Sequence, residues 1–199
     1  MWEDRYASND HYLFGEEPAH VLRENPWLVG DARSALCVAD GEGRNSVFLA
    51  QQGVAVTSFD LSATAISRTE ALAMKAGVRV DAHVSEWADW DWSKSFDLTV
   101  GIFVQFAGPD QRPQQFADLQ AATKPGGRLA LHGFTPEQIE HGTGGPPVAD
   151  NMYTKELLAD AFDGWNILRL ATYERTQESG SAHVGRAALI DLVAERPKV

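Results

Sequence analysis

CVADGEGRN (residues 37–45) connects an apolar, strand-like run, SALCVA (residues 34–39), to an apolar helical pattern. Gly41 and Gly43 stand one residue apart within it, directly after Asp40. Glycine lacks a Cβ, so the backbone of such a turn approaches a ligand closely. A strand, a glycine turn and a helix in this order are typical of a nucleotide-binding unit. The stretch therefore predicts a turn that holds a ligand, and the alternative is a structural turn that binds nothing.

Strands and helices alternate along the chain on both sides of this turn. The predicted strands are 34–39, 54–59, 78–84, 96–103 and 128–134, and the predicted helices are 44–52, 62–77, 110–127 and 154–162. Such alternation predicts a parallel sheet covered by helices. Two further β-like runs, 165–176 and 183–195, are separated only by a short loop, so we expect an antiparallel hairpin. The predicted fold class is α/β: a Rossmann-like three-layer sandwich with a seven-stranded, mostly parallel sheet and a C-terminal antiparallel hairpin.

The length of 199 residues fits one domain with a sizeable core. We expect a single domain over 1–199, with an N-terminal cap segment at 1–33 and the Rossmann-like core at 34–199. The stretch EHGTGGPPVADN (residues 140–151) is dense in glycine and proline. This composition favours a loop, and we interpret it as a lid over one end of the sheet.

Composition and charge narrow the function classes. The formal net charge of −11 argues against nucleic-acid binding, which needs clustered Lys and Arg. No run reaches the roughly 20 apolar residues of a membrane span, and the acidic start MWEDRYASND is unlike a signal peptide. A single cysteine allows neither an internal disulfide nor a cysteine-based zinc site. We expect a cytoplasmic protein that has no metal site and binds neither membrane nor nucleic acid.

Asp60 ends the second predicted strand, 19 residues after Gly41. A carboxylate at this place accepts hydrogen bonds from both ribose hydroxyls of a bound nucleotide. The dinucleotide fingerprint requires a third Gly or Ala, where this chain has Ser46. The turn and Asp60 together therefore favour a nucleoside site, while the evidence for a nicotinamide dinucleotide is incomplete.

The chain resembles the class I S-adenosylmethionine-dependent methyltransferases, and most of all the small bacterial branch similar to tellurite-resistance and thiopurine methyltransferases. The resemblance runs from Trp2 to Pro197 and is specific because several motifs occur in the family's order. The motifs are WEDRY, FGEEP, GEGRNSVFLAQQGVAVTSFDLS, FDLTVGIF, KPGGRLAL, TGGPP, MYTKELL and HVGRAALIDLVAERP. The resemblance implies S-adenosyl-L-methionine as the cofactor and methyl transfer to a small molecule as the activity.

Two positions depart from the family's pattern in the turn. Cys37 stands where the family has an acidic residue, and Ala39 stands where it has the first glycine. Ala39 adds a methyl group where the backbone should approach the cofactor. Asp40, three residues after Cys37, is the candidate to supply the missing charge.

The resemblance extends to the rest of the cofactor site. It places Glu86 near the adenine amino group. Trp87 either stacks on the base or packs on the sheet, and Leu61 packs on the adenine face. Arg5 is either a partner of the cofactor's carboxylate, because guanidinium pairs well with that group, or a solvated surface residue. The aromatic ring of Tyr12 is expected near the sulfonium, as is that of Phe14. The predicted cofactor-binding set is Arg5, Tyr12, Ala39, Asp40, Gly41, Gly43, Asp60, Leu61, Glu86, Trp87 and Phe103.

Methyl transfer needs alignment more than acid–base groups, so it leaves few catalytic signatures in a sequence. His183 begins the last predicted strand, where the matching branch also has a histidine, and we predict that it faces the acceptor. Gln105 follows the fourth strand, where relatives often have histidine, and is the second candidate. We interpret His132, inside the fifth strand, as a core residue.

The predicted partner is a small-molecule methyl acceptor, such as a thiol or a metalloid oxyanion, and the protein is a monomer or a homodimer. Two other functions stay open at this point. One is a nicotinamide-dependent oxidoreductase on a similar sheet. The other is a non-catalytic domain that binds S-adenosylmethionine.

Overall fold

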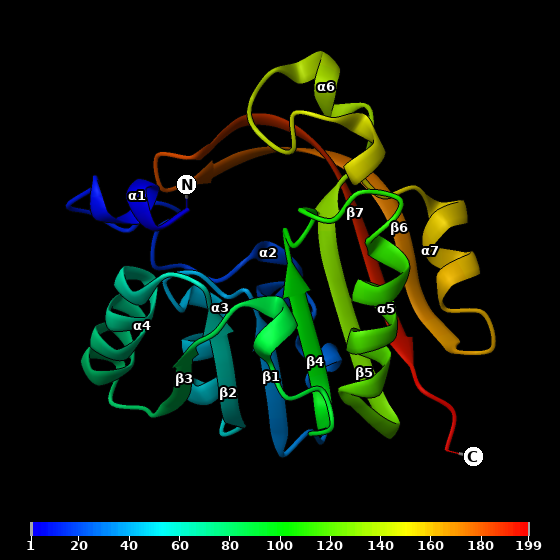
Figure 1. The fold of residues 1–199 in the computed structure, drawn as a ribbon, viewed down its shortest axis with the longest axis horizontal. Coiled ribbons are helices and arrows are strands. Elements are labelled where there is room, and N and C mark those ends of the chain that lie inside the picture. Colours follow the sequence, from blue (N-terminus) through cyan, green and yellow to red (C-terminus); the bar gives the residue numbers. More distant parts are fainter. Residues whose placement is uncertain (1, 199) are drawn as a thin grey trace.

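The computed structural model describes residues 2–198, apart from the side chains of Ser179 and His183. Its centre is a seven-stranded sheet with the order β3-β2-β1-β4-β5-β7-β6 (Figure 1). The strands are β1 (Ser34–Val38), β2 (Ala55–Asp60), β3 (Val80–Val84), β4 (Phe96–Ile102), β5 (Thr123–Phe134), β6 (Asn166–Ser179) and β7 (His183–Glu195). The first five are parallel, while β7 runs antiparallel to both β5 and β6. This confirms the predicted fold class, including the C-terminal hairpin.

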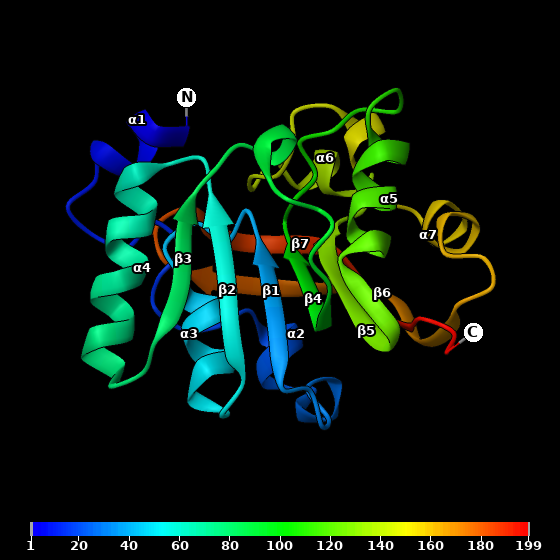
Figure 2. The same cartoon turned by 60° about the horizontal axis from the view of Figure 1, so that its bottom comes forward.

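Helices cover the sheet and its edge. They are α1 (Trp2–Ala7), α2 (His20–Arg23), α3 (Arg44–Gln51), α4 (Ala63–Ala76), α5 (Arg112–Ala121), α6 (Gln138–His141) and α7 (Lys155–Ala161). Figure 2 shows α2 and α3 behind the sheet, α5 in front of it and α4 beside β3. Within residues 2–198, no helix is both long and apolar enough to cross a membrane.

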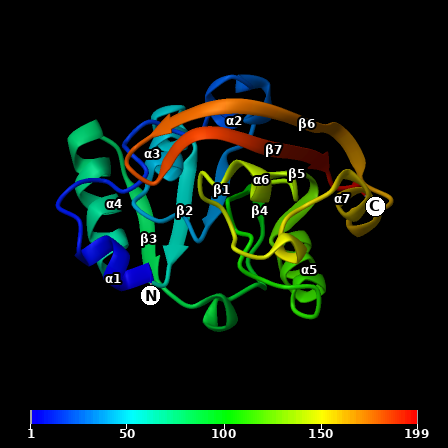
Figure 3. The ribbon, with the colours of Figure 1, turned by 90° about the horizontal axis from the view of Figure 1, so that it is seen from above.

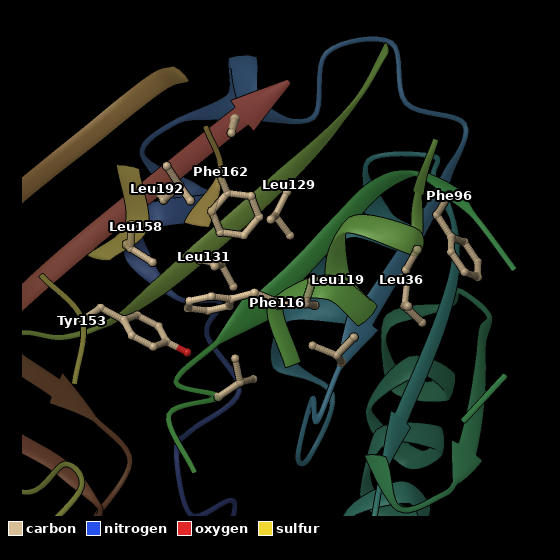
Figure 4. Close-up of a cluster of buried hydrophobic side chains, with 14 of the residues drawn as sticks. Leu36, Phe96, Phe116, Leu119, Leu129, Leu131, Tyr153, Leu158, Phe162 and Leu192 are labelled. Atoms are coloured by element: carbon tan, nitrogen blue, oxygen red, sulfur yellow. The ribbon is translucent and has the colours of Figure 1, made fainter. Parts of the chain in front are cut away.

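Alternate residues of β1 supply two separate cores, because successive side chains of a strand point to opposite faces. Leu36 and Val38 are buried with residues of α5 and α7, among them Phe116 and Leu158 (Figure 4). Ala35 and Cys37 are buried in the second core, with residues of α2 and α3. Cys37 is therefore a small buried residue of β1, and burial raises the pKa of its thiol.

Three segments differ from the secondary structure expected from the sequence. The helix expected over 110–127 ends at Ala121, because Thr123 already pairs with Phe96 before a bulge leads into the main β4–β5 register. Residues 140–151 are not wholly irregular: they begin inside α6 and end in a 3-10 turn, η3 (Ala149–Asn151). The N-terminal cap segment contains α1 and α2, for which no helix bounds are predicted.

Candidate functional site

The turn between β1 and α3 is built on left-handed backbone conformations. Gly41 has φ +64° and Gly43 has φ +85°. A Cβ on Gly41 would lie 2.7 Å from the hydroxyl of Tyr6, and one on Gly43 would lie 2.8 Å from the Cα of Thr69. Both positions therefore require glycine. Ala39 has φ +46°, so this departure from the family's pattern places a side chain in a region that costs it roughly 1–2 kcal/mol.

Asp60 fastens this turn to the end of β2. Its Oδ2 accepts a hydrogen bond from the backbone N–H of Gly41 at 2.9 Å, and its Oδ1 accepts one from Ser62 at 3.0 Å. Burial raises the pKa of Asp60, and these backbone bonds oppose the rise. Each carboxylate oxygen has a second lone pair, so the group can still accept ribose hydroxyls.

Two other predicted residues lie at the same edge. The backbone N–H of Ser85 donates to the carbonyl oxygen of Asp60 at 3.0 Å, which brings Glu86 beside the end of β2. Glu86 is exposed, and Leu61 is 46% exposed. An exposed leucine beside the exposed carboxylate of Glu86 suits an adenine that needs one apolar face and one polar edge. The structure thus brings Asp60, Leu61 and Glu86 together where the sequence predicts the nucleoside.

Asp40 has a buried oxygen with no partner. Its Oδ2 is shielded from solvent and makes no hydrogen bond within the described residues. Burial and the nearby Asp60 raise the pKa of Asp40 to about 7, although hydrogen bonds from Ser46 oppose the rise. An ammonium group beside the turn would satisfy this acceptor. The orphaned oxygen and the glycine cradle therefore fit a cofactor that carries both a nucleoside and an amino acid.

The N-terminal segment closes the outer side of the turn. Tyr6 of α1 is buried, with its hydroxyl over Gly41. Glu3 accepts hydrogen bonds from the backbone N–H of Thr64 at 3.2 Å and from the hydroxyl of Ser62, so it caps α4. These contacts hold α1 against the turn and against the start of α4.

A buried ion pair holds the next part of this segment. Glu42, inside the turn, pairs with Arg68 of α4 at 2.5 Å and accepts the backbone N–H of Leu13 at 2.7 Å. Arg68 also donates to the carbonyl oxygens of Asn9 and His11. The turn, α4 and residues 9–13 therefore form one hydrogen-bonded unit.

Two predicted residues lie away from the turn. Arg5 is exposed and stacks over Trp2, with 4.5 Å from its guanidinium carbon to the ring. The hydroxyl of Tyr12 donates to the carbonyl oxygen of Arg68 at 3.1 Å, and its ring packs on a small cluster between α3 and α4. Their contacts with the cofactor stay predictions that would require the side chains to move.

Trp87 belongs to an aromatic cluster in the segment between β3 and β4, which packs on Phe59 of β2. It lies in the 3-10 turn η2 (Trp87–Asp89), and its indole N–H donates to Asp118 of α5 at 2.7 Å. Its ring contacts Phe59, Trp92 and Phe106 at centroid distances of 4.7–6.0 Å. These contacts favour the packing interpretation, and stacking on the base stays a prediction.

Phe103 and Gln105 follow β4 at the carboxyl edge of the sheet. Phe103 has φ +58°, and its ring contacts His132 and Phe134. The amide of Gln105 makes two hydrogen bonds to the backbone of Phe134, one at each polar atom, at 2.7 and 2.8 Å. Gln105 therefore fastens the ends of β4 and β5, and contact with an acceptor would require these bonds to break.

His183 is the first residue of β7 and pairs with Ser179, but its side chain lies outside the described part of the structure. The neighbouring turn is well anchored, since the N–H groups of Ser181 and Ala182 donate to the carbonyl oxygen of Leu13 at 3.0 and 3.2 Å. The tip of the β6–β7 hairpin thus lies against the N-terminal segment. The role of His183 stays a prediction.

A cavity of about 290 Å³ opens beside the turn. It is bounded by the segment before α2, by β6, by the start of α3 and by Phe103. Its lining residues are Glu17, Pro18, Ala19, His20, Arg23, Arg44, Phe103, Arg175, Thr176, Gln177 and Glu178. A protein of net charge −11 thus has a cavity lined by three arginines and two glutamates.

Arg44 is the residue of this cavity that directly follows the glycine turn, and its role is absent from the predicted set. It is 7% exposed and donates to the carbonyl oxygen of Phe14 at 3.1 Å. None of the ion pairs among the described residues includes it. Burial lowers its pKa to about 10. The Arg-Asn pair after the glycines is the sequence signal that points to this position.

A family model described as a methyltransferase domain matches residues 35–127, which run from β1 into β5. A search of curated protein sequences finds no match.

Similar solved structures cover nearly the whole chain. One comes from work on the conversion of a disulfide bond into a thioacetal group during echinomycin biosynthesis: its TM-score is 0.80 at 18% identity, over 99% of this chain and 91% of that one. TehB from Haemophilus influenzae has a TM-score of 0.71 at 14% sequence identity, over 98% of this chain and 67% of the TehB chain. The N-methyltransferase NodS from Bradyrhizobium japonicum, solved with S-adenosyl-L-homocysteine, has a TM-score of 0.71 at 14% sequence identity, over 98% of this chain and 96% of the NodS chain. At these identities the likeness shows the fold.

Proposed function

Because residues 35–127 belong to the methyltransferase-domain family, the chain is an S-adenosylmethionine-dependent methyltransferase, and we propose that it methylates a small molecule rather than a macromolecule. The class of the enzyme follows from the family. The size and chemistry of the acceptor are argued from the segments that cover the carboxyl edge of the sheet.

The cofactor side of the proposal assigns roles to four residues. Asp60 accepts the ribose hydroxyls, and Leu61 and Glu86 lie at the adenine. Asp40 accepts the ammonium group of the amino-acid end through the oxygen that is otherwise orphaned. When bound, S-adenosylmethionine supplies a methyl group activated by a positively charged sulfur. The residues of this chain bind and orient it, because alignment provides most of the rate in such a displacement.

The observation that supports a small acceptor is that three segments cover the edge where the strands end. Figure 3, which looks onto this edge, shows α1 near β3 and α6 near β4 and β5. The N-terminal segment is held by the Glu42–Arg68 pair and meets the tip of the β6–β7 hairpin at Leu13. The loop after α6 is pinned to β7, since the hydroxyl of Thr143 donates to the carbonyl oxygen of Arg186. A covered edge excludes water and large substrates alike.

The experiment that tests the proposal is a titration followed by an acceptor screen. We expect S-adenosylmethionine and S-adenosylhomocysteine to bind in calorimetry and NAD not to bind. Thiols, halides and metalloid oxyanions are then offered with labelled S-adenosylmethionine, beside a protein and an RNA as controls. Binding of NAD alone would overturn the cofactor assignment. Methylation of the protein or RNA, with none of any small molecule, would overturn the acceptor assignment.

A further inference from the structure

A buried row of polar side chains crosses the C-terminal strands on the face that α2 covers. His132 of β5 lies directly opposite Asp191 of β7, which lies opposite Ala171 of β6. Arg169 and Tyr173 stand two residues on either side of Ala171. Positions two apart on a strand share a face, so all four polar side chains of this row point to one side of the sheet.

Asp191 is the centre of the row and is 1% exposed. Its Oδ1 lies 2.7 Å from His132 Nδ1 and 2.9 Å from the hydroxyl of Tyr173, and its Oδ2 lies 2.8 Å from Arg169 Nε. Burial opposes its ionisation, but these three hydrogen bonds hold the pKa of the carboxyl below its usual value. Asp191 is therefore a carboxylate at neutral pH and can only accept hydrogen bonds.

The charge of Asp191 determines the orientation of the next two groups. The hydroxyl proton of Tyr173 is donated to Asp191, so the tyrosine oxygen is left as an acceptor. His20 of α2 places its Nε2 2.6 Å from that oxygen. Two acceptors cannot share a hydrogen bond, so Nε2 of His20 carries the proton. In a neutral imidazole the other nitrogen, Nδ1, is then bare.

His20 lines the cavity described above, as do Arg44 at the start of α3 and Phe103, the residue after β4. Besides Tyr173, the groups whose charges act on His20 are His132 of β5, Arg175 of β6, Asp191 of β7 and Glu24. Burial, with His132 and Arg175, lowers the pKa of His20 to about 4, although Asp191 and Glu24 oppose this. The imidazole is therefore neutral at physiological pH, and its bare nitrogen is available as a base.

We propose that this cavity receives the methyl acceptor, that the acceptor is a small anionic thiol, and that His20 Nδ1 takes its proton. The proposal rests on the proposed function. In the step, the acceptor's S–H proton moves to Nδ1 while its sulfur forms a bond to the methyl carbon. The bond from that carbon to the sulfonium breaks, and its electron pair stays on the departing thioether. The proton becomes strongly acidic as the sulfur is alkylated, so a weakly basic nitrogen suffices.

The preference for an anion follows from the arginines. Arg44 is buried and makes no ion pair among the described residues, although the charges of Asp40 and Glu42 act on it. By contrast, Arg175 is paired with Glu24 through two hydrogen bonds, and Arg23 lies 3.9 Å from Glu17. A buried guanidinium without a direct ion pair is costly, so a negative group on the acceptor would supply the pair that Arg44 lacks. Fully deprotonated metalloid oxyanions would supply the negative charge, but they have no proton for His20 to accept.

The first test reads the tautomer directly. In protein labelled with ¹⁵N-histidine, the His20 resonances are assigned by their loss in His20→Gln. We expect Nε2 at the protonated position and Nδ1 at the unprotonated one, and we expect Tyr173→Phe to mix the two tautomers. A protonated Nδ1 in the parent protein overturns the assignment of His20 as the base.

The second test measures turnover with 3-mercaptopropionate and with 3-mercaptopropan-1-ol, a neutral thiol of matched length. We expect the anionic thiol to be preferred, and His20→Gln to lower its kcat by about a hundredfold, the low end of the range for general bases, because His20 is a weak base. Gln at position 20 keeps an N–H for Tyr173 but has no basic nitrogen, so it is the matched variant. Equal kcat in parent and variant overturns the role of His20, and equal use of the two thiols overturns the preference for an anion.

Binding measurements distinguish failure of the acceptor assignment from failure of the proposed methyltransferase function. Failure of the parent protein to bind S-adenosylhomocysteine would contradict the proposed function itself. If the parent binds it, 3-mercaptopropionate should shift the His20 resonances of that complex, whether or not it is methylated. No shift there overturns the cavity as the acceptor's site. A large loss of S-adenosylhomocysteine affinity in Arg44→Gln would assign the cavity to the cofactor's carboxylate and overturn the proposal equally.

Discussion

The two halves of the sheet build their polar sites in different ways. Around β1 and β2, the partners are close in the chain and largely backbone: Asp60 binds N–H groups of Gly41 and Ser62. Around β5, β7 and β6, the partners are distant side chains: His20 and Tyr173 are 153 residues apart. The first arrangement depends on local turns and tolerates changes elsewhere. The second depends on strand register and on the packing of α2, so one substitution disturbs several groups at once.

The largest effect is expected when the charge of Asp191, at the centre of the network of distant side chains, is removed. Asp191→Ala leaves Arg169, His132 and Tyr173 without their shared acceptor in a buried place, which should cost about 3–5 kcal/mol of stability. Urea denaturation measures the loss, with the exposed Asp81→Ala as a control. A loss below 1 kcal/mol would mean that the network is solvated and not buried as described.

The matching change in the local site is Asp60→Ala. It removes two hydrogen bonds that hold the turn and the predicted acceptor for the ribose, so we expect cofactor affinity to fall by about 1–3 kcal/mol. Calorimetry with S-adenosylhomocysteine gives the value, and Asp81→Ala, on the neighbouring strand, is again the control. Equal affinity in variant and parent would end the assignment of Asp60 to the nucleoside.

The titration of Asp40 tests the local site around β1 separately from the distant network. Its folded pKa of about 7 lies above the ordinary value, so the folded protein binds more protons than the unfolded chain and loses stability as pH rises from about 4 to 7. Binding of an ammonium group requires the ionised form, so affinity for S-adenosylhomocysteine should rise up to about tenfold between pH 6 and 8.

Asp40→Asn provides the comparison for this pH effect. The variant should show a flatter affinity profile, because its residue 40 has no proton to release. A parallel rise in parent and variant would assign the pH dependence to the ligand instead of Asp40.

The smallest expected effect is at Ala39. Its φ of +46° suits glycine, so Ala39→Gly should stabilise the protein by about 0.5–1 kcal/mol after the greater flexibility of the unfolded glycine is allowed for. The midpoint of urea denaturation should rise without a change in slope. A lower midpoint would show that the alanine methyl contributes more to packing against the core than its backbone conformation costs.

The same contrast explains how far the sequence could predict the molecule. The strand and helix alternation, the glycine turn and Asp60 are predictable, because periodicity and short spacings determine them. The chain His20–Tyr173–Asp191–His132 is not, because it requires the β5–β7–β6 register. His132 looks like a core histidine from sequence, and its burial fits that, yet its Nδ1 belongs to the network. The sequence also does not tell which arginine lies beside the turn, because packing decides it. Arg5 stacks on Trp2, whereas Arg44 is buried beside the turn.

The aromatic cluster at η2 has a practical consequence. Trp87, Trp90 and Trp92 are three of the six tryptophans in the chain, and all three lie against Phe59, one residue before Asp60. Trp87 and Trp92 are 4.7 Å apart, close enough for their electronic transitions to couple. These tryptophans therefore lie beside the proposed nucleoside site, and we expect their fluorescence and circular dichroism to change when S-adenosylhomocysteine binds, without any attached dye.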